Sequence, residues 1–334
     1  MLVGGAGFIG HNLALELARL GSSVMVVDNQ VVNNLSGLVA NSDIEAVRHR
    51  VYMNFLLSRY ELMRGLGVEL RNVDARLMSD LSSAVKDFQP NQIVHLSAIS
   101  SAVEARKNPG LCFDLQLITL RNVLELSRER RTPVMFLSSS TVYGDFEKPT
   151  VNETDRPQPR GIYANAKYMG ERLVRTYAQQ HGVPSVIIRP SALYGERCVS
   201  GRVSQVFIEN ALIGKPLLLE GGGDGRLDFT YIEDLVQGMV RALSIKKPNG
   251  YTNTFNLTFG NARTIAELAA IVQQVVPEVQ LEERPRANDK PVRGTLSTDR
   301  AKAVLGFDPE WTLETGYLKY CQWYAETWRA LQEN

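Results

Sequence analysis

The stretch Gly4-Gly5-Ala6-Gly7-Phe8-Ile9-Gly10 joins a short apolar run, Met1–Val3, to a helix-like pattern over Gly10–Leu20. Glycines permit a tight turn and let backbone N–H groups approach a phosphate, which then lies at the positive end of the helix. The next apolar run, Ser23–Val27, is followed by Asp28. A carboxylate there accepts hydrogen bonds from an adenosine 2′-hydroxyl and repels a 2′-phosphate. The pattern therefore predicts a dinucleotide site that selects NAD over NADP.

Apolar, β-branched runs alternate with helix-like stretches as far as residue 188, which is typical of a parallel sheet with crossover helices. The later runs are Val68–Val73, Gln92–Leu96, Val134–Leu137 and Ser185–Ile188, and the later helical stretches include Leu111–Arg130 and Ala164–His181. The last of these ends at Gly182, which is a good helix stop. Because crossovers are right-handed, we expect an α/β fold with a doubly wound parallel sheet, the Rossmann fold.

After Ile188 the alternation stops, and glycines and prolines separate shorter elements, with one return to the sheet near Asn253–Asn256. We expect an NAD-binding Rossmann domain formed by residues 1–188 and 222–258. Residues 189–221 and 259–334 would form a smaller α/β substrate domain. Residues 29–67 are a long connection where a short one is commoner. Because Ile44–Leu66 has apolar residues at helical spacing, we expect an added helix packed on the surface; a partner-binding or cofactor-covering role is the alternative.

The composition excludes several classes of protein. The 334 residues carry a net charge of +1, which gives no basic excess for nucleic acid. Three scattered cysteines form no disulfide framework or zinc site and indicate a reducing compartment. The four histidines do not cluster, so no metal is expected. No apolar run reaches the ~18 residues that a membrane span needs, and no basic leader precedes the glycines. We expect a cytoplasmic protein.

Tyr163 and Lys167 stand four residues apart at the start of a helical stretch, so they share one face. A free tyrosine has a pKa of about 10, which is too high for a base at neutral pH. A nearby ammonium and a positive nicotinamide ring favour the phenolate. Tyr163 is then predicted to take the proton of a substrate hydroxyl while hydride leaves the same carbon.

These motifs occur in one order along the chain: GGAGFIG, Asp28, Asp74, HLSA at residues 95–98, SSSTVYG at residues 138–144, and Tyr163-x-x-x-Lys167. In that order the chain resembles the extended short-chain dehydrogenases/reductases over nearly its whole length, and among them the nucleotide-sugar epimerase/dehydratase type. The resemblance implies NAD as cofactor. The residues expected to contact NAD are Gly4, Gly7, Phe8, Ile9, Gly10, Asp28, Asn29, Asp74, Ala75, Leu96, Ser97, Ala98, Tyr163, Lys167 and Pro190.

The resemblance also assigns catalytic roles. Ser139 stands where the family carries its catalytic Ser or Thr, with Ser138 and Ser140 as rivals in the run of three serines. Lys167 would hold the nicotinamide ribose. Sugar-nucleotide 4,6-dehydratases and UDP-glucuronate decarboxylases carry an acidic residue just after the catalytic serine, whereas Ser140 and Thr141 follow it here. Dehydration is therefore disfavoured, and oxidation with re-reduction at one carbinol centre remains.

Substrate contacts are expected from several segments. Arg189–Gly195 resembles the family's R-x-x-N-x-Y-G, with Ala192 where the asparagine usually stands. Arg226 resembles the arginine that binds the diphosphate, and Arg293 is the expected second phosphate ligand, with Arg286 as the alternative. Arginine suits this role because its planar fork binds phosphate oxygens in pairs. Ser139 and Ser140 complete the expected substrate contacts.

The sequence as a whole predicts an NAD-dependent epimerase of nucleoside-diphosphate sugars, acting at C4 through a 4-keto intermediate. One alternative is a net oxidoreductase of the same substrates, either a ketoreductase or a dehydrogenase. Another is a non-catalytic protein that binds NAD as a structural or sensing ligand. By resemblance we expect a homodimer that pairs through the helices at Leu111–Arg130 and Ala164–His181.

Overall fold

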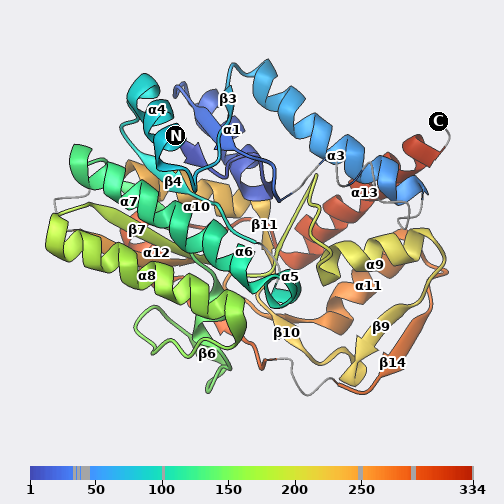
Figure 1. The fold of residues 1–334 in the computed structure, drawn as a ribbon. Helices are drawn as coiled ribbons and strands as arrows, with labels where there is room; N and C mark the ends of the chain where they lie inside the picture. Colours follow the sequence, from blue (N-terminus) through green and yellow to red (C-terminus); the bar gives the residue numbers. More distant parts are fainter. Residues whose placement is uncertain are drawn as a thin grey trace.

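A seven-stranded parallel sheet forms the centre of the molecule (Figure 1). The computed structural model describes residues 1–32, 35, 38, 46–99, 102–246, 251–286 and 291–332. The strands are β1 (Leu2–Val3), β2 (Met25–Asp28), β3 (Glu69–Asn72), β4 (Ile93–His95), β5 (Val134–Leu137), β7 (Ser185–Pro190) and β12 (Thr252–Leu257). Their order is β12-β7-β5-β4-β1-β2-β3. The order reverses between β1 and β4, which confirms the predicted doubly wound sheet.

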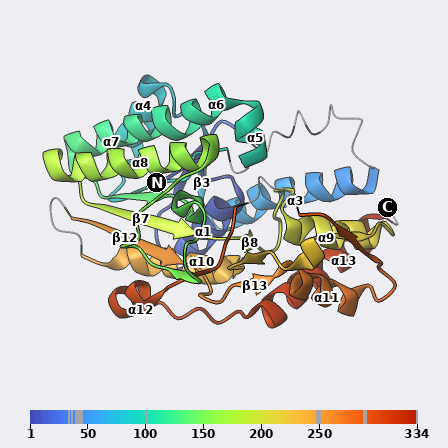
Figure 2. The same cartoon turned by 90° about the horizontal axis from the view of Figure 1, so that it is seen from below.

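Helices cover both faces of the sheet (Figure 2). Helices α4 (Met78–Phe88), α7 (Thr119–Arg130) and α8 (Gly161–His181) lie on one face, and α1 (Phe8–Arg19) and α10 (Ile232–Ser244) lie on the other. Successive strand residues point to opposite faces. Leu2 and Val26 therefore join the core with α1 and α10, whereas Val3 and Val27 join the core with α4 and α7. Burial on both faces explains the continuous apolar runs in the sequence.

The predicted elements agree with the structure apart from their ends. Helix α8 ends at a left-handed Gly182 (φ 70°), as expected for its stop signal. The stretch predicted as one helix from Leu111 is instead α6 (Pro109–Phe113), a π-helical turn (Asp114–Ile118) and then α7. Pro109 at the first position starts this segment. The predicted late strand is β12, which pairs with β7 at the edge of the sheet.

Short strand pairs and further helices lie beside the large sheet, and most of them come from the second half of the chain. The strand pairs are β8 (Leu193–Tyr194) with β11 (Thr230–Tyr231), β9 (Leu217–Glu220) with β14 (Leu281–Arg284), β10 (Arg226–Leu227) with β13 (Arg263–Thr264), and β6 (Thr150–Val151) with β15 (Thr295–Leu296). The helices are α5 (Ala102–Lys107), α9 (Val203–Leu212), α11 (Ile265–Val275), α12 (Asp299–Leu305) and α13 (Leu318–Gln332). None of the helices in the described ranges is long and apolar enough to cross a membrane.

The insertion contains the expected helix, α3 (Ala46–Gly65), although residues 44 and 45 of the predicted stretch lie outside the described residues. Helix α3 packs against α13 and α1. Phe55 stacks on Trp323 with ring centroids 5.0 Å apart. The buried Glu209 of α9 accepts hydrogen bonds from Tyr52 of α3 (2.9 Å) and from Tyr324 of α13 (2.6 Å). These contacts fix α3 on the body of the protein.

Candidate functional site

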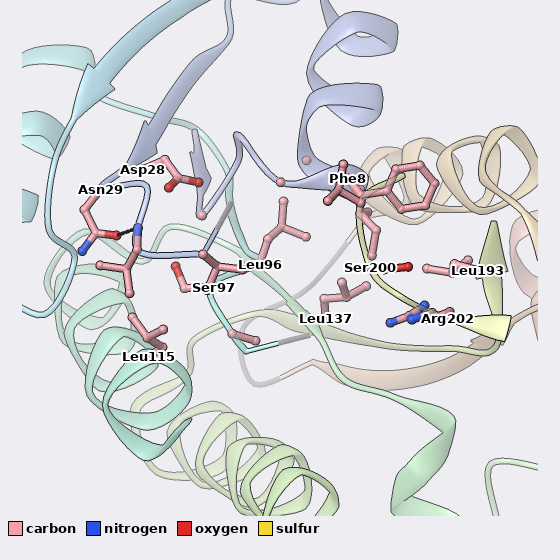
Figure 3. A pocket seen from close by; sticks show the side chains of 18 residues that line it. Phe8, Asp28, Asn29, Leu96, Ser97, Leu115, Leu137, Leu193, Ser200 and Arg202 are labelled. Carbon is pink, nitrogen blue, oxygen red and sulfur yellow. Dashed lines mark hydrogen bonds between the residues drawn. The ribbon is translucent and has the colours of Figure 1, made fainter. Parts of the chain in front are cut away.

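The main cavity opens where the strand order reverses, at the carboxyl ends of β1, β2 and β4 (Figure 3). Ligands of doubly wound sheets bind at this point. Its empty volume is about 810 Å³, and a neighbouring cavity of about 240 Å³ shares Gly4, Asp28, Asn29, Ser97 and Leu115 with it. Because the two hollows share part of their lining, they form one continuous site that suits an extended ligand such as a dinucleotide.

The glycine-rich loop forms one wall of the main cavity through Gly4, Gly7 and Gly10. Gly4 has φ +75°, and a Cβ there would lie 2.6 Å from the backbone nitrogen of Ser97. At Gly10 a Cβ would lie 2.4 Å from the carbonyl oxygen of Gly5. Glycine is therefore required at both positions, because the loop passes close to β4 and α1 begins close to the loop.

Asp28 ends β2 and faces both cavities. Its carboxylate accepts hydrogen bonds from the backbone N–H of Ala6 (3.0 Å) and of Gln30 (2.8 Å). Burial raises the pKa of Asp28, and these two bonds oppose that rise. The carboxylate is thus held by the glycine-rich loop and the chain after β2, at the edge of the cavity, where it can accept hydrogen bonds from a ribose.

The smaller cavity is lined by Asp74 and Ala75. Asp74 pairs with Arg76, whose Nη2 lies 2.6 Å from Oδ2. Hydrogen bonds from Arg76 lower the pKa of Asp74 to about 2. Every residue predicted to contact NAD, apart from Tyr163, Lys167 and Pro190, lines one of the two cavities. This placement agrees with the sequence interpretation, and their roles stay predictions.

Tyr163 and Lys167 lie on the first turns of α8, and Ser139 follows β5. Ser139 lies close enough to Tyr163 for its hydroxyl to lower the pKa of the phenol. The buried Lys167 donates from Nζ to the carbonyl of Leu137 (2.8 Å), and its Nζ lies 6.0 Å from the centre of the Tyr163 ring. The structure therefore brings the three predicted catalytic side chains together, next to Leu137 of the cavity wall.

Burial governs the protonation of this group. It raises the pKa of Tyr163, whereas the charge of Arg202 and the hydroxyl of Ser139 lower it. Burial lowers the pKa of Lys167 to about 8, so its ammonium is still mostly charged at pH 7. Tyr163 is thus a neutral phenol in the protein alone, and a further positive charge beside it would favour the phenolate.

The three serines after β5 face different surroundings. Ser138 donates its hydroxyl to Glu171 (2.6 Å), which forms a buried ion pair with Arg189 at 2.7 Å. Ser139 Oγ instead accepts from the hydroxyl of Thr141 (3.0 Å) and lies beside Tyr163. Ser138 is therefore turned into the protein interior, which favours Ser139 over that rival, and the choice between Ser139 and Ser140 stays a prediction.

The predicted substrate residues are spread more widely. The half-buried Arg293 donates to the Ser140 carbonyl (3.0 Å), which places it beside the catalytic group. Arg226 is exposed on β10 and donates to the Ala262 carbonyl (3.0 Å), outside the lining of the two cavities. Ala192 has φ +34°, a left-handed conformation that an L residue rarely adopts. Their roles in substrate binding remain predictions.

Sequence reasoning missed a cluster that lines the main cavity after β8, namely Val199, Ser200 and Arg202. Figure 3 shows Ser200 and Arg202 at the end of the cavity away from Asp28 and Asn29. Because the charge of Arg202 acts on Tyr163, this end is the one next to the catalytic group. The segment has no periodic pattern, and only its position after the R-x-x-x-x-Y-G motif could have pointed to it.

No group of metal-binding side chains is found among the residues that the structure describes. The candidate site thus combines a cavity that suits a dinucleotide with the side chains of Ser139, Tyr163 and Lys167. Arg202 supplies a positive charge at the same end as these three residues. Proton transfer to or from a hydroxyl held at Tyr163 is the chemistry that these side chains can supply.

Comparisons with known proteins agree with this architecture. The model of the family described as "NAD dependent epimerase/dehydratase family" matches residues 1–257. The chain is 28% identical to UDP-glucuronic acid decarboxylase 2 of Arabidopsis thaliana, over 95% of this chain and 66% of that protein. It is 27% identical to UDP-glucuronate 4-epimerase 2 of the same plant, over 97% of this chain and 75% of that protein.

A solved structure has the same fold. The crystal structure of UDP-glucuronic acid 4-epimerase from Bacillus cereus, in complex with UDP-glucuronic acid and NAD, superposes with a TM-score of 0.80. The match covers 97% of this chain and 98% of that one, at 23% sequence identity.

Proposed function

Because the chain belongs to the NAD-dependent epimerase/dehydratase family, we propose that it is an epimerase of nucleoside-diphosphate sugars that acts at C4. The observation that carries the proposal is the grouping of Ser139, Tyr163 and Lys167 next to a cavity framed by the glycine-rich loop and Asp28. The names of the relatives supply the substrate class, since they act on or bind UDP-sugars.

The side chains at the site support a separate role for each of Tyr163, Ser139 and Lys167. Tyr163 takes the proton of the sugar hydroxyl, and Ser139 holds the oxygen that loses it. Lys167 supplies a buried positive charge that favours the phenolate of Tyr163. NAD held by the glycine-rich loop and Asp28 would supply the redox chemistry, namely reversible hydride transfer at C4 of the sugar. Tyr163 gives the proton back at the end of the cycle.

The positions after Ser139 argue against dehydration and decarboxylation. Thr141 donates its hydroxyl to Ser139, and the carbonyl of Ser140 accepts from Arg293. Neither side chain can act as a carboxylic acid or carboxylate at pH 7. In the described part of the chain, the carboxylates that line the cavities are Asp28 and Asp74, which lie at the nucleotide end. This arrangement supports a hydride cycle at one carbon, although decarboxylases are among the relatives.

A panel of UDP-, GDP-, CDP- and dTDP-sugars tests the proposal. We expect one class of sugar nucleotide to be converted to an isomer without stoichiometric consumption of NAD. A net oxidoreductase would consume NAD or NADH in step with product. A protein that binds NAD but converts no member of the panel would be the non-catalytic alternative. Chromatography of the sugar nucleotides together with absorbance at 340 nm, which reports NADH, separates these outcomes.

Asp28 should control the choice of cofactor. Its carboxylate lies at the ribose end of the cavity and repels a 2′-phosphate, so NAD should bind at least about tenfold more tightly than NADP, about 1.4 kcal/mol. Replacement of Asp28 by alanine should bring the affinities for NAD and NADP closer together. Titration calorimetry with both dinucleotides measures it, and equal affinities in the unmutated protein would refute this role of Asp28.

We also propose that the protein is a homodimer that pairs through α7 and α8. Both helices lie on the same face of the sheet (Figure 2), and α8 presents the exposed Met169.

A further inference from the structure

Helix α3 carries a fully buried arginine, Arg59, directly behind the glycine-rich loop. Its Nη1 donates to the carbonyl of Ala6 (3.5 Å), and its Nη2 donates to the carbonyl of Arg197 (2.5 Å). Its Nε has no hydrogen-bond partner among the described residues. Arg59 thus donates hydrogen bonds to backbone carbonyls, and it forms no ion pair with a carboxylate among the described residues.

A buried guanidinium without a paired carboxylate is costly, because its charge has left water. Burial lowers the pKa of Arg59 to about 10, and Asp28 is among the groups that oppose this. The side chain therefore stays charged at pH 7. Burial, and after it the charges of Arg59 and Arg197, lower the pKa of His11 on α1, so this ring is neutral. Arg59 thus places a buried positive charge beside the Ala6 carbonyl of the loop.

The hydrogen bond to Ala6 orients the next peptide group. In a planar trans peptide the C=O and the following N–H point in opposite directions. Because the Ala6 carbonyl points toward Arg59, the N–H of Gly7 points the other way, and Gly7 lines the main cavity. The N–H of Ala6 is itself bound by Asp28. The two peptides that flank Ala6 are thus fixed by two side chains from different elements.

We propose that Arg59 is a positioning residue for a diphosphate bound at the glycine-rich loop. It holds the Ala6 carbonyl, directs the Gly7 N–H into the cavity, and places a buried positive charge behind the phosphates. The inserted helix α3 then has a role in cofactor binding, because its packing on α13 fixes Arg59 in place. This inference rests on the proposed function, since the diphosphate is the pyrophosphate of NAD.

Binding of ADP, NAD and adenosine to Arg59→Met tests the inference by titration calorimetry. Methionine keeps much of the volume and removes the charge and both hydrogen bonds. We expect the affinities for ADP and NAD to fall at least tenfold, while the affinity for adenosine changes less than twofold. Arg64→Met is the matched control, because Arg64 is an exposed arginine of the same helix. It should leave all three affinities unchanged.

Arg59→Lys provides a second variant in case the methionine variant does not fold. Lysine keeps a positive charge but lacks the guanidinium group that bonds to the carbonyls of Ala6 and Arg197. The affinity for ADP should therefore fall at least threefold, while the affinity for adenosine stays unchanged. ADP binding by either variant at the parent's affinity would overturn the inference, as would equal losses for ADP and adenosine. A parent protein that binds neither ADP nor NAD would instead contradict the proposed function.

Discussion

Replacement of Tyr163 by phenylalanine should reduce turnover by about a hundredfold or more, while the fold and NAD binding are retained. The phenol is the proton acceptor in the proposed cycle, and phenylalanine keeps the ring but has no group to take a proton. Tyr163 is half-buried beside Ser139 and Lys167.

The matched control for this variant is Tyr168→Phe, on the next turn of α8, which should leave turnover close to that of the parent. The measurement is kcat with the sugar nucleotide that the panel identifies, together with the affinity for NAD. Turnover of Tyr163→Phe within a factor of a few of the parent would mean that a different residue is the base.

Replacement of Lys167 by methionine should also lower turnover at pH 7 by about a hundredfold. The ammonium nitrogen of Lys167 lies 6.0 Å from the centre of the Tyr163 ring, so its removal should disfavour the phenolate. Burial already raises the pKa of Tyr163. The variant's activity should therefore recover as the pH rises, because the phenol then ionises without help. The parent should not show this steep rise, because Lys167 and the positive nicotinamide ring of bound NAD together already favour the phenolate.

The measurement is the pH dependence of kcat for the parent and for Lys167→Met. Because a buried charge is costly, we expect the protein to fold with methionine at this position. The thermal unfolding temperature of the variant checks this. A variant whose activity is low but has the same pH profile as the parent would contradict the electrostatic role. Lys167 would then act only through its hydrogen bond to Leu137.

Local signals explain why much of the fold could be predicted from the sequence. The glycines at residues 4–10, Asp28 and the stop at Gly182 each form a short recognisable pattern, although Gly4 is required by the distant Ser97 and Asp28 is held by Ala6. The apolar runs of the central strands are continuous because helices cover both faces of the sheet. Patterns of this kind can be recognised in a short window of sequence before any contact is known.

Other parts of the site depend on long-range packing. The loop that carries Arg202 reaches Tyr163 only through the folded chain, and nothing periodic marks it. Arg226 matches a family segment, yet the structure places it on the exposed strand β10. Arg59 did have a local signal, because it stands four residues from both Phe55 and Met63, within the buried stripe of α3. A charge in that stripe indicates a specific partner inside the protein.

The most direct test of the epimerase mechanism is the reaction of the identified sugar nucleotide in heavy water, followed by mass spectrometry and NMR of the product. A hydride cycle at C4 predicts an isomer of unchanged mass with no deuterium on carbon, since the hydrogen leaves and returns as hydride. It also predicts no consumption of added NAD. A product that has lost water or carbon dioxide, or that carries deuterium at C3 or C5, would contradict the proposed mechanism.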